Sequence, residues 1–150
     1  MQVPQDSYVA VAEADAYHAM RPSRDAWALL TADEKEQQLV MASDFLDANY
    51  RFKGKKTDES QAREFPRNGQ VDVPVVVKKA VFELAMQTDL SSNPEPYITR
   101  EKVAVIEVEY ADSSAHNTRF AYIDGLLKDW LYKASGMGAI MVARGSYGCC

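Results

Sequence analysis

The chain has 150 residues, a formal net charge of −5 at pH 7, 47% hydrophobic residues and 26% charged residues. This length suits one domain with a sizeable core, and the balanced composition excludes wholesale disorder. The acidic balance argues against a protein that coats duplex DNA, because such binding depends on many Lys and Arg contacts to phosphate, but it leaves room for a local basic patch.

Cysteine usage and apolar runs bear on the compartment. The only cysteines are the adjacent Cys149 and Cys150, so no intrachain disulfide can close a useful loop, and a reducing cytosol fits. The N-terminal MQVPQDSYVA has neither the basic region nor the apolar core of a signal peptide. No apolar run approaches the ~20 residues that span a bilayer, so we expect no membrane segment.

The N-terminal part predicts an extended arm and two helices. Residues 1–8 form the arm, because Pro4 disfavours helix just before it. VAVAEADAYHAMR, residues 9–21, is rich in Ala and predicts the first helix, although Ala10 stands where Ser or Thr caps better. After Pro22, residues 25–30 predict a short second helix.

A third helix opens with the capping-box pattern Thr31-Ala-Asp-Glu34 and should run to about Tyr50. Asp44 and Asp47 fall on one side of this helix. Another side carries Leu39, Ala42, Phe45, Leu46 and Asn49.

Residues 51–73 predict a long loop, because Gly54, Pro66 and Gly69 break any periodicity. Within the loop, Phe65 to Gly69 is typical of a turn with Phe65 tucked beneath it.

A fourth helix should begin at Pro74, whose missing N–H costs nothing at the first helical position. Its buried stripe is expected at Val77, Ala80, Val81, Leu84, Ala85 and Thr88. Its outward positions are Lys78, Lys79, Glu83 and Gln87.

The only strong β signal is KVAVIEVEY, Lys102 to Tyr110. A single strand cannot stand alone, so it must pair in a local hairpin or with a strand of another chain. A last helix is expected over residues 120–132. Its apolar stripe is Ile123, Leu126, Leu127, Trp130 and Leu131.

The C-terminal KASGMGAIMVARGSYGCC combines glycines with apolar residues, a pattern typical of a flexible segment that docks elsewhere. Its candidate docking residues are Ile140, Met141, Val142 and Tyr147. We therefore expect a mainly α fold, a small bundle of about four helices with a β-hairpin or strand arm. Residues 1–132 form the domain and residues 133–150 form a docking tail.

No motif indicates catalysis, a metal or a cofactor. His18 and His116 do not form a metal-binding pair, and a surface or half-buried position is expected for each. Glu107 and Glu109 lie ~7 Å apart on one strand face, which could suit a glycosidase pair but is more typical of a solvated face. The chain is therefore not expected to be an enzyme.

A basic segment follows the third helix and consists of Arg51, Lys53, Lys55 and Lys56. It interleaves with Tyr50 and Phe52, a combination that can bind single-stranded nucleic acid by stacking and charge. The alternatives are a solvated helix end, where cations favour the helix dipole, and a surface that docks another protein. The residues alone leave these alternatives open.

Five stretches occur in an order that resembles the small head–tail connector, or adaptor, proteins of tailed bacteriophages. They are SYVAVAEADAYHAMR, DAWALLTADEKEQQLVMASDFLDANYRFKGKK, QAREFPRNG, VPVVVKKAVFELA and IEVEY. Sequences of this type also carry the label of DnaT-like single-stranded-DNA-binding proteins. The resemblance covers roughly residues 7–131, departs from the usual pattern at Ala10 and does not extend beyond Lys133.

The resemblance implies a structural virion protein. Such connectors form a ring of about a dozen copies beneath the portal and join capsid to tail, after assembly in the host cytoplasm. The implied partners are further copies of the chain, the portal, tail or nozzle proteins and the passing genomic DNA. Related connectors often grip the portal with their C-terminus.

The basic segment and the four tail residues are then candidate portal or subunit contacts. Asp44 and Asp47 are candidate partners of the basic segment on the next subunit. A closed head-to-tail ring needs two complementary patches on each subunit. The alternative function is a single-stranded nucleic-acid-binding module.

Overall fold

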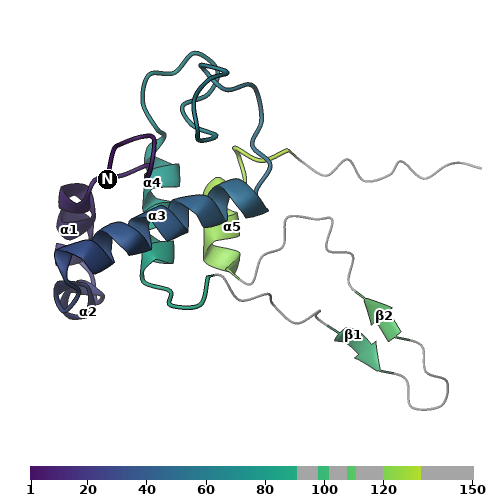
Figure 1. The fold of residues 1–150 in the computed structure, drawn as a ribbon. Helices are drawn as coiled ribbons and strands as arrows, with labels where there is room; N and C mark the ends of the chain where they lie inside the picture. The colour runs from purple at the N-terminus through teal and green to yellow at the C-terminus, as the bar shows by residue number, and fades with distance from the viewer. Residues whose placement is uncertain (91–97, 102–107, 111–119, 133–150) are drawn as a thin grey trace, which may run out of the picture.

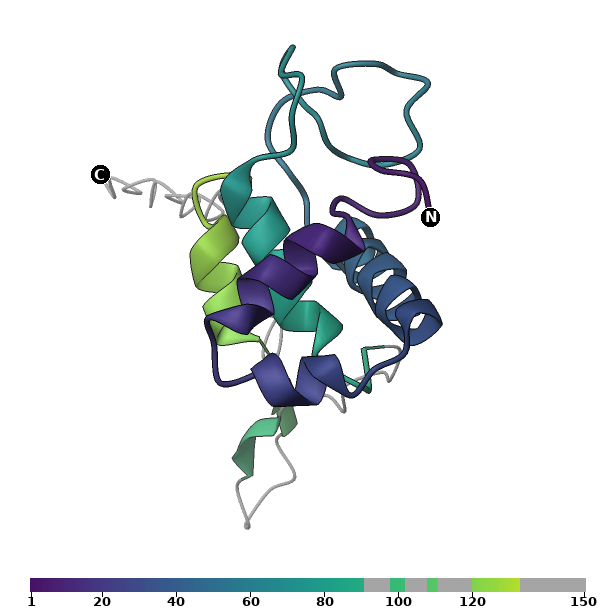
Figure 2. The same ribbon diagram turned by 90° about the vertical axis from the view of Figure 1, so that its left-hand side faces the viewer.

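The computed structural model describes residues 1–90, 98–101, 108–110 and 120–132, and this part of the chain is mainly helical. Figures 1 and 2 show α3 crossing the side-by-side pair α4 and α5, with α1 and α2 at one end of the bundle. The helices are α1 Val11–Ala19, α2 Arg24–Ala28, α3 Ala32–Asn49, α4 Val75–Ala85 and α5 Ala121–Leu127. The strands are β1 Ile98–Glu101 and β2 Val108–Tyr110.

The first two helices are shorter than the sequence predicts. Ala10 caps α1 without a side-chain acceptor, as expected, but the Glu13 carboxylate accepts a hydrogen bond of 2.9 Å from the Ala10 amide. This bond is one of the two that make up a capping box, and the other is missing because Ala10 has no side-chain acceptor. Between α1 and α2, the buried His18 ring stacks on Trp27 at 4.6 Å and its Nδ1 bonds the Ser23 hydroxyl. Burial lowers the pKa of His18.

The predicted capping box at the start of α3 is confirmed. The Glu34 amide donates to the Thr31 hydroxyl at 3.3 Å, and the Thr31 amide donates to the Glu34 carboxylate at 2.8 Å. The helix ends at Asn49 with Tyr50 as its C-cap, as predicted. Of the expected apolar side, Leu39, Ala42 and Leu46 are buried, Phe45 is half-buried and Asn49 is exposed.

Helix α4 packs against both α3 and α5 and supplies the centre of the core. It begins at Val75, one residue later than predicted, with Pro74 as its N-cap. Five of the six predicted stripe residues are buried, namely Val77, Ala80, Val81, Leu84 and Ala85. The prediction for Thr88 is wrong. The Gln87 amide bonds the Leu84 carbonyl in a tightened last turn, and Thr88 lies exposed beyond the helix.

Helix α5 ends at Leu127, five residues before the predicted end at Tyr132. The chain then extends along the start of the long loop, where the Lys53 amide donates to the Trp130 carbonyl and the Tyr132 amide donates to the Arg51 carbonyl. These bonds flank a bridge between Phe52 and Leu131 and require extended backbone, so the helix cannot continue. Ile123, Leu127 and Leu131 are buried as predicted.

The two short strands pair antiparallel, with Arg100 opposite Glu109 and Glu101 opposite Val108. Strand β2 covers the last three residues of the predicted strand at 102–110. Residues 102–107 lie outside the described residues, so the β arm as a whole stays a prediction. Within the described ranges, no helix is long and apolar enough to cross a bilayer.

Candidate functional site

The long loop at 51–73 contains neither helix nor strand, as predicted, but buried Arg67 holds it in one shape. Its guanidinium donates to the carbonyls of Phe52 at 3.1 Å, Lys53 at 3.0 Å and Gly54 at 2.5 Å, and it also pairs with the Glu64 carboxylate. One planar donor group therefore fixes the backbone of the basic segment.

The predicted turn closes this part of the loop. Asn68 adopts a φ of 57°, its amide donates to the Lys55 carbonyl at 2.8 Å, and its side-chain oxygen accepts from the Lys55 amide at 3.1 Å. Gly54 adopts a φ of 81°, and a Cβ there would lie 1.8 Å from the Asn68 side-chain oxygen. Only glycine fits at this position. Phe65 is buried beneath the turn, as predicted.

Arg63 ties the loop to α3 and to the N-terminal arm. Its guanidinium pairs with Asp44 at 2.8 Å and Asp47 at 2.9 Å and donates to the Asp6 carbonyl. The Tyr8 hydroxyl donates to Asp47, and burial, with the nearby Asp47 carboxylate, raises the pKa of Tyr8. Burial also raises the pKa of Asp47, against hydrogen bonds from Tyr8 and Arg63 that favour the charged form.

Asp44 and Asp47 were expected to pair with the basic segment of the next subunit, and this expectation needs correction. Both carboxylates bind Arg63 of the same chain, and Asp47 lies mostly inside this network. Asp44 keeps an outward surface, because its side chain is 64% exposed. Asp44 is therefore the better placed of the two to meet a partner.

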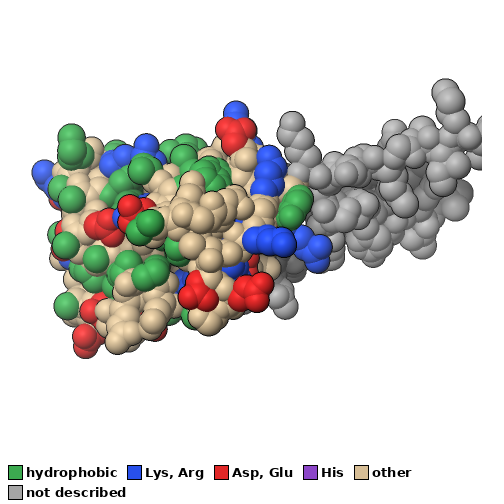
Figure 3. Space-filling model, turned by 90° about the horizontal axis from the view of Figure 1, so that it is seen from above, with side chains coloured by type: hydrophobic (Ala, Val, Ile, Leu, Met, Phe, Trp, Pro, Cys, Tyr) green, Lys and Arg blue, Asp and Glu red, His purple; other side chains and the backbone are tan. Residues whose placement is uncertain are grey.

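The basic segment lies at the surface beyond the C-terminal end of α3. Figure 3 views the molecule from the side of the long loop and shows Lys and Arg side chains gathered at one end, near Asp and Glu side chains. Lys56 pairs with Glu64 at 3.4 Å, and the Lys53 ammonium donates to the Asp129 carbonyl at 3.0 Å. Arg51 and Lys55 are exposed, and neither makes an ion pair within the described ranges.

The aromatic residues of the basic segment point inward, against the stacking interpretation. Tyr50 and Phe52 are each 3% exposed. The Phe52 ring packs edge-on against Phe65 at 4.7 Å, and the Tyr50 hydroxyl donates to Asp124 at 2.6 Å. Neither ring is available to stack on a base in this conformation, so the surface keeps the charge of the segment without its aromatic faces.

One aromatic that sequence reasoning did not place at this site lies beside the cations. Tyr132 stands opposite Arg51 across the bridge, and its side chain is on the face away from buried Leu131, because successive residues of an extended chain point to opposite sides. It is 53% exposed. No local pattern signals this neighbour, because it comes from the far end of the domain.

Sequence reasoning also missed the two buried arginines. The sequence gives little indication that Arg63 and Arg67 are buried, because both lie in a loop without periodicity. The acids at Asp44 and Asp47, three residues apart on one helix, were the available hint of a shared cation. The four tail residues named above, Ile140, Met141, Val142 and Tyr147, lie outside the described residues.

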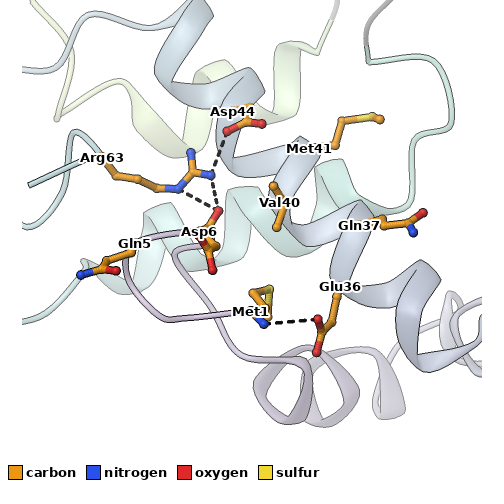
Figure 4. A pocket seen from close by; sticks show the side chains of 9 residues that line it. All are labelled: Met1, Gln5, Asp6, Glu36, Gln37, Val40, Met41, Asp44 and Arg63. Carbon is orange, nitrogen blue, oxygen red and sulfur yellow. Dashed lines mark hydrogen bonds and ion pairs between the residues drawn. The ribbon is translucent and has the colours of Figure 1, made fainter.

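A groove opens between the N-terminal arm and α3, with a volume of about 550 Å³. Figure 4 shows Val40 and Met41 of α3 on one side, Met1 and Asp6 of the arm on another, and Arg63 reaching toward Asp44 and the arm. The groove has an apolar floor and a polar rim. Among the residues that the structure describes, no group of His, Cys, Asp or Glu is arranged to hold a metal ion.

The fold and these surfaces define a small helical-bundle protein with an exposed basic segment and an open groove. The family described as "Putative DnaT-like ssDNA binding protein" matches residues 2–145, and the chain belongs to this family. A search of curated proteins finds no significant match, and a search of solved structures finds none.

Proposed function

We propose that this protein is a structural virion component, a head–tail connector that forms a ring of about a dozen copies beneath the portal and joins capsid to tail. It acts without catalysis, and its partners are its own copies, the portal, tail or nozzle proteins and the passing DNA. The proposal rests on the resemblance of residues 7–131 to such connectors and on the form of the basic segment.

The observation that best supports this proposal is that the basic segment forms a charged surface of fixed backbone shape, with its aromatic rings turned inward. Arg67 and Asn68 fix its backbone, so docking another protein orders few additional groups. Arg51 and Lys55 face solvent, whereas Tyr50 and Phe52 belong to the core. This arrangement suits contact with an acidic protein surface better than stacking on bases.

Two further parts of the proposal concern segments at the edge of the described structure. The β arm, of which β1 and β2 are described, extends the subunit toward neighbours or tail proteins. The tail at 133–150 grips the portal through its apolar residues. The ring assembles in the host cytoplasm and resides at the head–tail junction of the virion.

The test reverses two charges of the basic segment, Lys53→Glu with Lys55→Glu. The free energy of unfolding should change by no more than about 0.5 kcal/mol, because surface substitutions away from buried networks cost little. The double variant should be impaired in ring closure or portal docking, which light scattering and electron microscopy measure. High salt should weaken the assembly of the wild-type protein in the same way, because it screens the same charges. The control with equal charge change is Arg24→Glu with Lys79→Glu, on α2 and α4.

A second candidate function is single-stranded DNA binding, which the family description and the exposed Tyr132 beside Arg51 favour. Fluorescence anisotropy with an oligothymidylate, at several salt concentrations, measures it directly. If the double variant assembles normally at every salt concentration but loses oligonucleotide binding, the connector interpretation of the segment is wrong and the nucleic-acid function replaces it.

A further inference from the structure

The groove beside α3 has the apolar floor of a docking site. Val40 and Met41 come from adjacent positions of α3, and Met1 of the arm lies near Val40. Met41 is exposed, although helix positions with large apolar side chains are usually covered. Flexible Met side chains adapt to a partner and make favourable contacts with aromatic rings.

The rim of the groove is acidic. Glu36 and Asp44 stand one on each side of the floor along α3, with side chains 47% and 64% exposed. Arg63 at the base is 8% exposed, and its single guanidinium is shared between Asp44 and Asp47. The Met1 ammonium also lies in the groove and pairs with Glu36 at 3.4 Å. These two cations face the carboxylates of Asp6, Glu36, Asp44 and Asp47, which leaves the groove with an excess of negative charge.

The surface around Tyr132 has the opposite character. Tyr132 projects beside Arg51, its neighbour across the bridge, and Lys55 follows on the same segment. Arg51 and Lys55 make no ion pair among the residues described here, so both charges are available. Tyr and Arg are two of the three residue types enriched among the side chains that contribute most to binding at protein interfaces.

We propose that the groove of one copy receives Tyr132 of a second copy, with Arg51 and Lys55 of that copy facing Glu36 and Asp44. The inference rests on the ring proposed above and names its two contacting surfaces. The ring of Tyr132 contacts the floor at Met41 and Val40, and the cations contact the rim.

Both surfaces belong to every subunit and lie at different places along α3. The helix rise puts roughly 15 Å between Val40, at the floor, and Tyr50, which precedes Arg51. A contact between two different patches is heterologous, and such contacts build closed rings or open filaments rather than two-fold dimers. The separate positions of groove and basic segment are therefore compatible with the ring that the connector function requires.

Cross-linking tests the contact between Tyr132 and the floor. In a background of Cys149→Ser and Cys150→Ser, a Met41→Cys protein is mixed with a Tyr132→Cys protein under ring-forming conditions with the portal and then oxidised. The mixture should give at least tenfold more covalent dimer than either protein alone. A mixture of Met20→Cys with Tyr132→Cys is the matched control, because Met20 is an exposed methionine on α1's end, outside the groove.

A charge swap tests the rim. Glu36→Lys and Arg51→Glu should each weaken assembly at least tenfold, and their combination in one chain should restore most of the loss, since opposite charges then meet again at every interface. Glu59→Lys, on an exposed loop position outside the groove, should leave assembly unchanged. A merely structural role for Glu36 or Arg51 predicts additive losses without rescue.

The outcomes separate this inference from the proposed function. If wild-type rings form, but Met41→Cys with Tyr132→Cys cross-links no better than the control and the swap gives no rescue, the groove contact is overturned and the connector function stands. If the wild-type protein stays monomeric both alone and with the portal, the connector function and this contact fall together.

Discussion

Arg63 joins the long loop, to which it belongs, to the N-terminal arm and to α3, because its guanidinium reaches a group in each of these two elements. It is 8% exposed and pairs with Asp44 and Asp47, while it also donates to the Asp6 carbonyl. Tyr8 completes the network through its hydroxyl, which donates to Asp47 and accepts from the Glu64 amide. A loop without regular structure thereby acquires a fixed position on the helical body.

We predict that Arg63→Met destabilises the protein by about 1–3 kcal/mol, because it leaves the half-buried Asp47 carboxylate without its cation. Arg24→Met is the control, since Arg24 forms only an exposed pair with Asp25, and it should change stability by less than about 0.5 kcal/mol. Urea unfolding followed by circular dichroism measures both. Equal midpoints for the two variants would show that the network contributes little.

For individual residues, the sequence predicts contacts between near neighbours in the chain well and contacts between distant segments poorly. The Thr31 capping box and the turn beneath which Phe65 lies involve neighbours in sequence, so residue preferences reveal them. The partners of Arg63 and the position of Tyr132 depend on segments far apart in the chain. No periodicity or capping rule carries that information.

Among the elements, α4 shows the clearest link from sequence pattern to structure. Its apolar residues recur at helical spacing, and the resulting stripe packs against α3 on one side and α5 on the other. Leu84 is fully buried in this stripe. A helix that is packed against two others has little freedom to move into a cavity. Loss of side-chain volume in this stripe should therefore lower the stability of the protein without much compensation.

We predict that Leu84→Ala lowers the free energy of unfolding by roughly 2–5 kcal/mol, from lost apolar burial and the cavity left behind. Leu29→Ala is the matched control, because Leu29 is 85% exposed at the end of α2 and should tolerate the same truncation. Thermal and urea unfolding measure the difference. A melting curve unchanged by Leu84→Ala would contradict the packing of α4.

Element ends were less predictable than element centres. The apolar spacing of residues 123–131 favours a helix throughout, yet α5 stops at Leu127. Beyond that point, backbone bonds to Arg51 and Lys53 replace the helical ones, while Leu131 still reaches the core. Burial alone therefore does not distinguish the two conformations, because both place Leu131 inside.

For the whole molecule, the described contacts of the C-terminal region end at Tyr132, whose amide bonds Arg51. We predict that deletion of residues 134–150 leaves the melting temperature within a few degrees of the full chain, since the helical core and the bridge are retained. The same deletion should weaken portal attachment in a pull-down or by electron microscopy. Portal binding of undiminished strength by the shortened chain would assign the docking role to another surface.

The bridge between Phe52 and Leu131 has a consequence for biosynthesis. The Lys53 ammonium and the Asp129 carbonyl, which meet beside it, are 76 positions apart. While the ribosome is still adding the intervening residues, Phe52 lacks its contact with Leu131, and the basic segment lacks the extended residues 130–132 that bond to its backbone. The basic segment is completed only after Leu131 has emerged from the ribosome, so for the proposed ring we expect prematurely terminated chains to be excluded.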